Sequence, residues 1–491
     1  MNVRFREEHL RSFGAASLDF NPLHVSESYA RRTSSGERVV YGMLGFLACL
    51  RKVPVPANRI PSGVRIDFKS PLFLDVEYTI AMEQEAPENV RIALLDGRAI
   101  MMRARLQFRD GTPQNANLPE TGIAPRRDSR RLEAHDFAQK LSFRGTYAPP
   151  HAAYSQLLDL LGIDRRTWGD ALPVAALCSS YMTGMELPGE RATWSGLRLE
   201  ILTPRPEAPF TFEIALGSHN AQFGLVQSQF TLGGANGIWA RGEMSSIVRH
   251  LRSRNSEVRV EPGSGRFEGK SALIVGASRG LGAAMALDLV AEGGTVVGVY
   301  AQSREDADEL LAASRNLPGR LIMERGEAAD LNSCIELKSR LRAELGRLDL
   351  LVCNAAPAIQ SLRVEEACYD RIRDYLAKGF ALAAAPLSCF LELISASGGC
   401  VLTISSSAVE EPPALWPHYV ALKTAVEGLV RAVAVANPKV TFWIARPGRI
   451  LTDLSDTPMG QLDAETPQSV SRRILEHVWG NASPGTVQFC R

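Results

Sequence analysis

The feature that most constrains the fold is a short apolar run that leads directly into three closely spaced glycines. Ser271-Ala272-Leu273-Ile274-Val275 has the composition of a buried strand, and Gly276, Gly280 and Gly282 follow it before a helical pattern begins. Glycines let a backbone approach a pyrophosphate, and the N-terminus of the helix supplies N–H donors and the positive end of its dipole. The spacing is G-x-x-x-G-x-G, which differs from the usual dinucleotide fingerprint and by itself also fits a plain tight turn. We predict a strand-turn-helix unit that holds a dinucleotide.

The periodicity of the chain changes near this motif. From Lys270 onward strands alternate with helices, which predicts a parallel sheet of the doubly wound α/β class. Before residue 250 the strands alternate between apolar and polar positions, which predicts antiparallel sheets with one buried face. The predicted strands are 63–68, 76–80, 100–108, 192–200, 210–214 and 224–230, and a helix over 153–161 ends at Gly162.

The length of 491 residues is too large for one hydrophobic core. Residues 111–132 and 250–268 are rich in Pro, Gly and polar side chains and are interpreted as linkers. We therefore predict three domains over residues 1–115, 133–250 and 268–491. The basic cluster within 126–131 is either a solvated connector or a docking point for an acidic carrier protein.

The composition, 45% hydrophobic and 22% charged with a net charge of +1, is that of an ordinary globular protein. It gives no reason to expect nucleic acid or an anionic membrane as a partner. The eight cysteines form no C-x-x-C pair, so we expect neither a metal site nor a disulfide framework. A charged start without an apolar stretch and the lack of a long apolar window predict neither a signal peptide nor a membrane span, and hence a cytoplasmic protein.

Three side chains near the end of the chain carry the chemistry of a carbonyl reductase. Ser406 follows a predicted strand, and Tyr419 and Lys423 lie one helical turn apart. Addition of hydride to a ketone requires a proton for the developing alkoxide. A free tyrosine has a pKa near 10, and a neighbouring ammonium is expected to lower it. An isolated Tyr/Lys pair would usually be a surface feature, but the strand and the serine before it favour an active site.

The residues at the end of the second predicted strand bear on the choice of cofactor. The strand over 295–300 is followed by Ala301-Gln302-Ser303-Arg304, without an acidic residue to accept the ribose 2′-hydroxyl. Nearby arginines, including Arg279 in the glycine turn, favour a 2′-phosphate, so we expect NADPH rather than NADH. The alternative is that these arginines bind no ligand.

Taken together, residues 268–491 resemble the short-chain dehydrogenase/reductase family. The resemblance implies that Ser406 binds the substrate carbonyl, that Tyr419 donates the proton and that Lys423 holds the nicotinamide ribose. Two positions depart from the family pattern: Tyr375 or Leu376 stands where the family commonly has an Asn, and Ala356 replaces a glycine. By the same resemblance the cofactor contacts are Gly276, Ser278, Arg279, Gly280, Leu281, Gly282, Asp330, Leu331, Asn354, Ala355, Lys423, Pro447, Gly448 and Thr452.

A second candidate site lies near the start of the chain. Asp19 and His24, separated by Asn21-Pro22, can share one water as acid and base, and the N–H of Gly42 at a helix start can bind a thioester oxygen. With the downstream segment 37–43, these residues resemble the MaoC-like (R)-specific enoyl hydratases, which have the hot-dog fold. The family usually has Gly where this chain has Leu18 and often His where it has Tyr41. A capping Asp and a surface His remain the alternative.

Residues 133–250 resemble a second hot-dog repeat without the catalytic pair, weakly, through Gly184-Met185-Glu186-Leu187-Pro188-Gly189. In the family such a half pairs with the active one and shapes an acyl tunnel.

The two resemblances together predict a bifunctional enzyme of fatty acid or polyketide metabolism. It would reduce a 3-oxoacyl thioester with NADPH and dehydrate the 3-hydroxyacyl product, or hydrate an enoyl thioester, with the acyl group on acyl carrier protein or coenzyme A. A homo-oligomer is expected from the resemblance. Three alternatives stay open: one half alone is active, the reductase acts on a non-thioester ketone, or the chain is a non-catalytic acyl-binding scaffold. If only one half is active, the missing Asn favours the reductase as the inactive half.

Overall fold

The chain forms two compact units, Met1–His250 and Leu251–Arg491. The computed structural model describes all residues except 87, 205, 250–257, 259, 456, 458–459, 481–483 and 491. The predicted linker over 250–268 therefore lies partly outside the described residues.

The first unit is a mixed structure of sheet and helices. Its strands are β1 Asn2–Arg4, β2 Val39–Val40, β3 Arg59–Phe68, β4 Leu72–Phe73, β5 Glu77–Ala86, β6 Asn89–Asp96, β7 Ala99–Asp110, β8 Ser142–Tyr147, β9 Ala192–Ile201, β10 Phe210–Asn220, β11 Leu225–Gly234 and β12 Gly237–Val248. Its helices are α1 Glu7–Ser17, α2 Pro22–Val25, α3 Glu27–Ala30, α4 Gly42–Leu50, α5 His151–Leu161, α6 Arg165–Trp168 and α7 Ala171–Tyr181, with a 3₁₀ turn Asp136–Ala138 and a π-helical turn Met182–Glu186.

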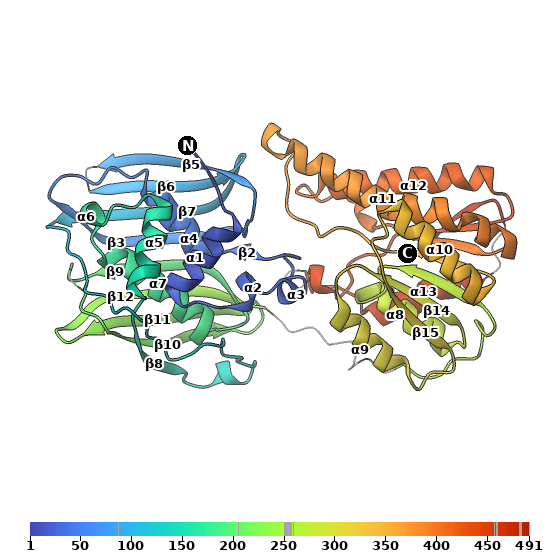
Figure 1. The fold of residues 1–491 in the computed structure, drawn as a ribbon, viewed down its shortest axis with the longest axis horizontal. Helices are drawn as coiled ribbons and strands as arrows, with labels where there is room; N and C mark the ends of the chain where they lie inside the picture. The colour runs from blue at the N-terminus through green and yellow to red at the C-terminus, as the bar shows by residue number, and fades with distance from the viewer. Residues whose placement is uncertain are drawn as a thin grey trace. The chain divides into compact units, whose positions relative to one another are not determined.

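Ten strands of this unit form one antiparallel sheet in the order β1-β5-β6-β7-β3-β9-β12-β11-β10-β8. The first five come from residues 2–110 and the last five from residues 142–248, and β3 pairs with β9 where the two halves meet. In Figure 1 the helices α1, α4, α5 and α7 lie across one face of this sheet. The two halves therefore share one backbone ladder and one hydrophobic core.

The apolar helices α4 and α7 occupy the centre of that core. Every residue of α7 is buried, and so is every residue of α4 after Gly42. A helix that is apolar all round is stable only where it is covered on all sides. The predicted helix over 153–161 is confirmed as α5, which ends at Gly162 in the left-handed conformation, φ +68°. The strands β6, β8 and β12 were not predicted.

The segment 111–132 is more than a solvated connector. Ile123 forms a β-bridge with Ala148. Arg130 Nε donates to the buried Glu186 at 2.6 Å, and its guanidinium lies 4.0 Å from the centre of the Phe143 ring. Part of the basic cluster is therefore used to hold this segment against the second half of the sheet.

The second unit contains the predicted parallel sheet. Its strands are β13 Ser271–Val275, β14 Thr295–Tyr300, β15 Arg320–Arg325, β16 Leu350–Cys353, β17 Cys400–Ile404, β18 Thr441–Ala445 and β19 Val487–Cys490. Its helices are α8 Gly280–Ala291, α9 Arg304–Ser314, α10 Leu331–Leu345, α11 Tyr369–Ser397, α12 Pro417–Ala436 and α13 Pro467–Trp479, with short 3₁₀ turns Glu366–Cys368, Ser407–Val409 and Asp453–Ser455.

The strand order is β15-β14-β13-β16-β17-β18-β19, with all pairs parallel. Helices α8, α9 and α13 pack together on one side, and α10, α11 and α12 pack together on the other (Figure 1). This is a Rossmann-like doubly wound sheet, as predicted. In such sheets ligands bind at the carboxyl ends of the strands, where the order reverses beside β13.

Helix α11 gives one result that the sequence interpretation did not expect. With the turn before it, it forms the one stretch among the described residues, Glu366–Ser397, that is long and apolar enough to cross a membrane by length and composition alone. Half of its most apolar window is buried inside the unit. Packing against α10, α12 and β16 accounts for this composition.

Candidate active sites

The glycine turn of the second unit has the backbone that its sequence predicts. Gly276 and Gly280 have φ angles of +83° and +60°, a region that side chains with a Cβ rarely adopt. The N–H groups of Gly276 and Ala277 both donate to Val299 O, which holds the turn against the end of β14. Helix α8 begins at Gly280, so its first N–H groups face the turn.

A Cβ atom would not fit at the third glycine. At Gly282 it would lie 2.1 Å from Gly276 O and 2.7 Å from Asn354 Nδ2. The Asn354 amide donates to Gly276 O at 2.8 Å, and thereby ties the loop after β16 to the turn. Ala355 N in the same loop donates to Val275 O. This close backbone cradle beside a helix N-terminus fits the pyrophosphate of a dinucleotide.

The loop after β18 completes this edge of the sheet. Thr452 Cγ2 lies 3.3 Å from the Cβ position of Gly280. Arg279 in the turn pairs with Asp453 at 3.1 Å, and Pro447 O accepts from Ser407 N. The predicted cofactor residues from the loops after β13, β16 and β18 are thus brought together, while Gly448 is exposed and contacts no side chain at its Cβ position.

The structure brings the three predicted catalytic side chains together. Ser406 begins the turn after β17, where its hydroxyl accepts from Ala408 N at 3.2 Å, and it lies close enough to Tyr419 to lower the pKa of the phenol. Lys423 lies one turn along α12 from Tyr419, with Nζ 5.7 Å from the centre of the phenol ring. The Lys423 ammonium is buried and donates to Ile404 O at 2.7 Å, so its direction is fixed by the last residue of β17.

The electrostatics differ from the expectation that Lys423 lowers the pKa of Tyr419. Burial raises the pKa of Tyr419, and the opposing effect comes from the Ser406 hydrogen bond. Burial also lowers the pKa of Lys423 to about 8. The reason is that the Lys423 ammonium is itself desolvated and donates to a backbone carbonyl. The group that favours the phenolate form of Tyr419 is therefore the Ser406 hydroxyl.

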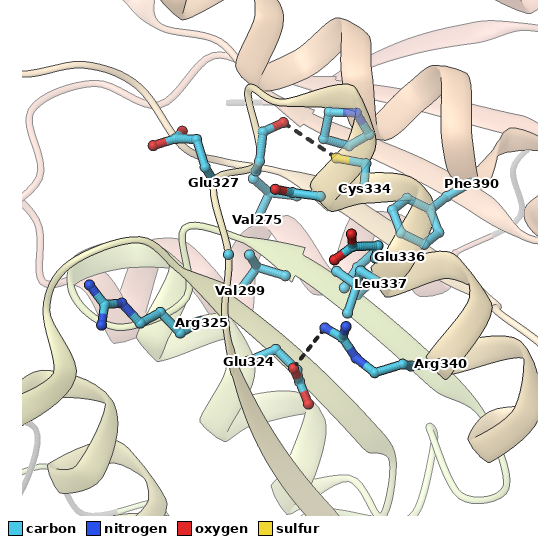
Figure 2. Close-up of a pocket in the computed structure, with 15 residues that line it drawn as sticks. Val275, Val299, Glu324, Arg325, Glu327, Cys334, Glu336, Leu337, Arg340 and Phe390 are labelled. Atoms are coloured by element: carbon cyan, nitrogen blue, oxygen red, sulfur yellow. Dashed lines mark hydrogen bonds and ion pairs between the residues drawn. The ribbon is translucent and has the colours of Figure 1, made fainter.

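Asp330 and Leu331 lie at the start of α10. Asp330 caps α10 by accepting from Ser333 N at 2.8 Å, and Leu331 is half exposed. Glu327 and Ala328, just before them, instead line a cavity of about 120 Å³ at the ends of β13, β14 and β15 (Figure 2).

Two further groups of side chains lie next to the reductase residues. Tyr375 donates to Pro357 O at 3.2 Å and packs edge-on against His418, with the ring centres 4.4 Å apart. Glu427, one turn after Lys423, accepts from Ser405 Oγ at 2.6 Å and from Arg446 Nη2 at 2.6 Å. Sequence reasoning did not single out His418 or Glu427, which carry no motif of their own.

In the first unit, Asp19 is buried in contact with helix α7 and the turn that follows it, which belong to the second half of the unit. Its exposed fraction is 2%, and Oδ2 accepts from Ser180 Oγ of α7 at 2.7 Å while Oδ1 accepts from Asn21 N at 3.1 Å. A Cβ on Gly184 would lie 2.4 Å from Oδ1. Burial raises the pKa of Asp19 to about 7 despite these two hydrogen bonds.

His24 is fixed by one ring nitrogen. Nδ1 lies 2.8 Å from Val39 O, so the neutral ring carries its proton on Nδ1 and offers a lone pair on Nε2. Burial lowers the pKa of His24 to about 4, which keeps the ring neutral at physiological pH. Tyr41 stacks on the imidazole with the ring centres 3.8 Å apart and donates to Asp19 O at 2.7 Å. Tyr41 therefore connects the two predicted catalytic residues.

Gly42 is the first residue of α4, as predicted, so its N–H belongs to the first turn of that helix. Its Cβ position lies 2.9 Å from the Phe68 ring, which leaves no room for a side chain there. No group of three or more His, Cys, Asp or Glu side chains is arranged to hold a metal ion in the described part of the chain.

Comparisons with known proteins bear on the second unit. The family model described as short chain dehydrogenase matches residues 270–460. An uncharacterised oxidoreductase from Methylorubrum extorquens is 31% identical over 201 residues, which cover 39% of this chain and 77% of the relative. A 3-oxoacyl-acyl-carrier-protein reductase from Staphylococcus aureus is 30% identical over 203 residues, covering 39% of this chain and 79% of the relative. The Escherichia coli protein of the same name is 30% identical over 211 residues, covering 41% and 83%. Through its second unit the chain belongs to the short-chain dehydrogenase family and is a nicotinamide-dependent oxidoreductase.

Proposed function

We propose that the second unit reduces a 3-oxoacyl thioester to a 3-hydroxyacyl thioester with NADPH. The observation that carries the proposal is the placement of Ser406 and the buried Lys423 ammonium around the Tyr419 phenol, at the strand ends that also carry the glycine turn. The thioester class is supported by the names of two relatives, both 3-oxoacyl-acyl-carrier-protein reductases. The acyl group would be carried by acyl carrier protein or coenzyme A.

In this reaction a bound nicotinamide supplies the hydride that adds to the carbonyl carbon. Ser406 donates a hydrogen bond to the carbonyl oxygen and holds it beside Tyr419. The Tyr419 hydroxyl gives its proton to the oxygen as it becomes an alkoxide, and the phenolate that remains is stabilised by the Ser406 hydroxyl. Because burial raises the pKa of Tyr419, the hydroxyl is protonated and ready to donate at neutral pH.

The test is the Tyr419→Phe variant with acetoacetyl-coenzyme A as substrate. We expect loss of ketone-dependent NADPH oxidation by about 100-fold or more, with NADPH binding retained, because only the proton donor is removed. Tyr369→Phe, at an exposed tyrosine on α11, is the matched control and should keep full activity. Undiminished turnover in Tyr419→Phe would refute the assignment.

We also propose that the first unit is a double hot-dog structure that dehydrates the 3-hydroxyacyl product to a trans-2-enoyl thioester. The supporting observation is the pair of opposite pKa shifts at Asp19 and His24, which Tyr41 connects. His24 Nε2 would take the proton from the carbon next to the thioester, and protonated Asp19 would give a proton to the departing hydroxyl, which leaves as water. Hydration of an enoyl thioester is the reverse of this step.

Hydration of crotonyl-coenzyme A tests this second activity without any nicotinamide. Asp19→Asn should reduce it by about 100-fold or more and leave ketone reduction unchanged. Asp159→Asn, at an exposed position on α5, is the matched control. If the unaltered protein reduces ketones but shows no hydration of enoyl thioesters of several lengths, the reductase stands alone and the first unit has another role.

A further inference from the structure

The end of strand β14 is where the adenosine ribose of the cofactor would lie, and an arginine of the neighbouring strand reaches it. Arg325 is the last residue of β15 and pairs with Tyr300, the last residue of β14. Its side chain extends along the strand ends, and Nε donates to Ala301 O at 3.1 Å. The glycine turn is held against the same strand through Val299 O. The turn and Arg325 therefore lie at the same end of β14.

The hydrogen bond to Ala301 uses Nε and leaves the two terminal nitrogens of the guanidinium for another partner. Arg325 is exposed, and no ion pair of this residue occurs among the residues that the structure describes. Its neighbour Glu324 points to the other side of β15 and pairs with Arg340 at 3.1 Å (Figure 2). Arg325 is thus a positioned cation that forms no ion pair with a carboxylate in the described part of the chain.

The two arginines that the sequence interpretation considered are both paired. Arg279 contacts Asp453 at 3.1 Å, and Arg304 lies 3.7 Å from Asp308 one turn along α9. The stretch Ala301-Gln302-Ser303 contains no acidic residue that would bind a ribose 2′-hydroxyl. Glu327, two residues after Arg325, accepts a weak hydrogen bond from Ala329 N at 3.4 Å.

From this arrangement we infer that Arg325 binds the 2′-phosphate of NADPH and sets the preference for NADPH over NADH. A guanidinium whose terminal nitrogens point outward can contact two phosphate oxygens at once, which suits a phosphate dianion better than a hydroxyl. The inference rests on the proposed cofactor and adds the residue that selects it. It also explains how a chain without a basic residue directly after β14 can discriminate between the two cofactors.

The experiment compares ligands with and without the 2′-phosphate on the full chain. Binding of adenosine 2′,5′-bisphosphate, adenosine 5′-monophosphate, NADPH and NADH is measured by calorimetry for the unaltered protein and for Arg325→Gln. We expect the variant to bind the bisphosphate and NADPH about 10- to 100-fold more weakly, and the other two ligands within about twofold, since one charge-assisted contact is lost. Higher salt should reduce the difference between the two proteins.

Two matched variants make the result specific. Arg320→Gln removes an exposed, paired arginine from the other end of the same strand and should change no binding constant. Arg304→Gln tests the arginine after β14. If Arg304→Gln loses NADPH selectivity while Arg325→Gln keeps it, the inference is overturned.

The remaining outcomes separate this inference from the proposed reductase. If the unaltered protein prefers NADPH and Arg325→Gln keeps that preference, Arg325 is not the determinant, and the reductase proposal is untouched. If the unaltered protein binds NADH more tightly and oxidises it with acetoacetyl-coenzyme A, the NADPH preference and the role of Arg325 both fall while ketone reduction stands. Loss of selectivity confined to Arg325→Gln supports the inference.

Discussion

The hydrogen bond from Ser180 to Asp19 offers a sharp test of the first site, because it joins the two halves of the first unit. Ser180 lies on α7, 161 positions from Asp19 in the sequence, and both side chains are buried. The substitution Ser180→Ala removes the donor and leaves the rest of the Asp19 environment in place. It therefore isolates one contribution to the pKa of a single carboxyl group.

The size of the effect follows from the geometry. A hydrogen bond to a charged group contributes about 1.5–3 kcal/mol, and one pKa unit corresponds to about 1.4 kcal/mol. Since Ser180 favours the ionised form and burial opposes it, loss of the serine should raise the pKa of Asp19 further above its present value of about 7. We expect a rise of about 1–2 units.

The sign of the effect on stability can be worked out from the same shift. The pKa of Asp19 is higher in the folded chain than in the unfolded one, so the folded state binds the extra proton between about pH 4 and about pH 7. Ionisation of Asp19 therefore costs stability as the pH rises through that window. In Ser180→Ala this cost grows, and the stability deficit relative to the unaltered protein should be larger at pH 9 than at pH 5 by about 1–3 kcal/mol.

The assay is a carboxyl ¹³C titration of Asp19 by NMR, with Asp19→Asn to assign the signal, together with urea unfolding at the two pH values. Ser179→Ala is the matched control, because Ser179 donates to Ala175 O at 2.7 Å, is equally buried and does not contact Asp19. A pKa that stays the same or falls in Ser180→Ala would refute the reasoning, as would an equal shift in the control.

Two glycine substitutions test the close contacts at the two sites, and a third tests an exposed helical glycine. Gly184→Ala should reduce enoyl hydration by about 10-fold or more, measured with crotonyl-coenzyme A, because the new Cβ would lie 2.4 Å from Asp19 Oδ1 and would displace that carboxylate. Gly282→Ala should lower the stability of the second unit by about 1–3 kcal/mol and abolish NADPH binding by calorimetry, because its Cβ would lie 2.1 Å from Gly276 O. Gly428→Ala, on the exposed face of α12 with no atom within 4 Å of its Cβ position, should instead stabilise the chain by about 0.5–1 kcal/mol in thermal unfolding.

Much of the second unit could be predicted because its signals are local. The strand before Gly276, the alternation of strands and helices and the Tyr419/Lys423 spacing each lie within a few consecutive residues. The structure brings the predicted side chains together at one edge of the sheet. The role that we propose for Arg325 could not be predicted, because it depends on the pairing of β15 with β14, which no local pattern in the sequence specifies.

The first unit was harder for the same reason. Asp19 and His24 were found through local spacing, but the partner that sets the pKa of Asp19 comes from Ser180 in the other half. The strands β6 and β12 were missed although both alternate in burial, because turns between neighbouring strands are short and no composition change marks them. The predicted domain boundary near residue 115 does not separate two sheets, because β3 before it pairs with β9 after it in one ladder.

The ladder between β3 and β9 limits where the chain can be cut or rearranged. A chain shortened to its first 115 residues would leave β3 as an unpaired edge strand. Such strands pair with strands of other molecules, and the protein aggregates. It would also lose the three carbonyl groups, of Gly184, Gly189 and Glu190, on which the Asn21 amide rests. Any truncation, circular permutation or domain transplant should therefore keep residues 1–249 together, even though Asp19 and His24 lie within the first 24 positions.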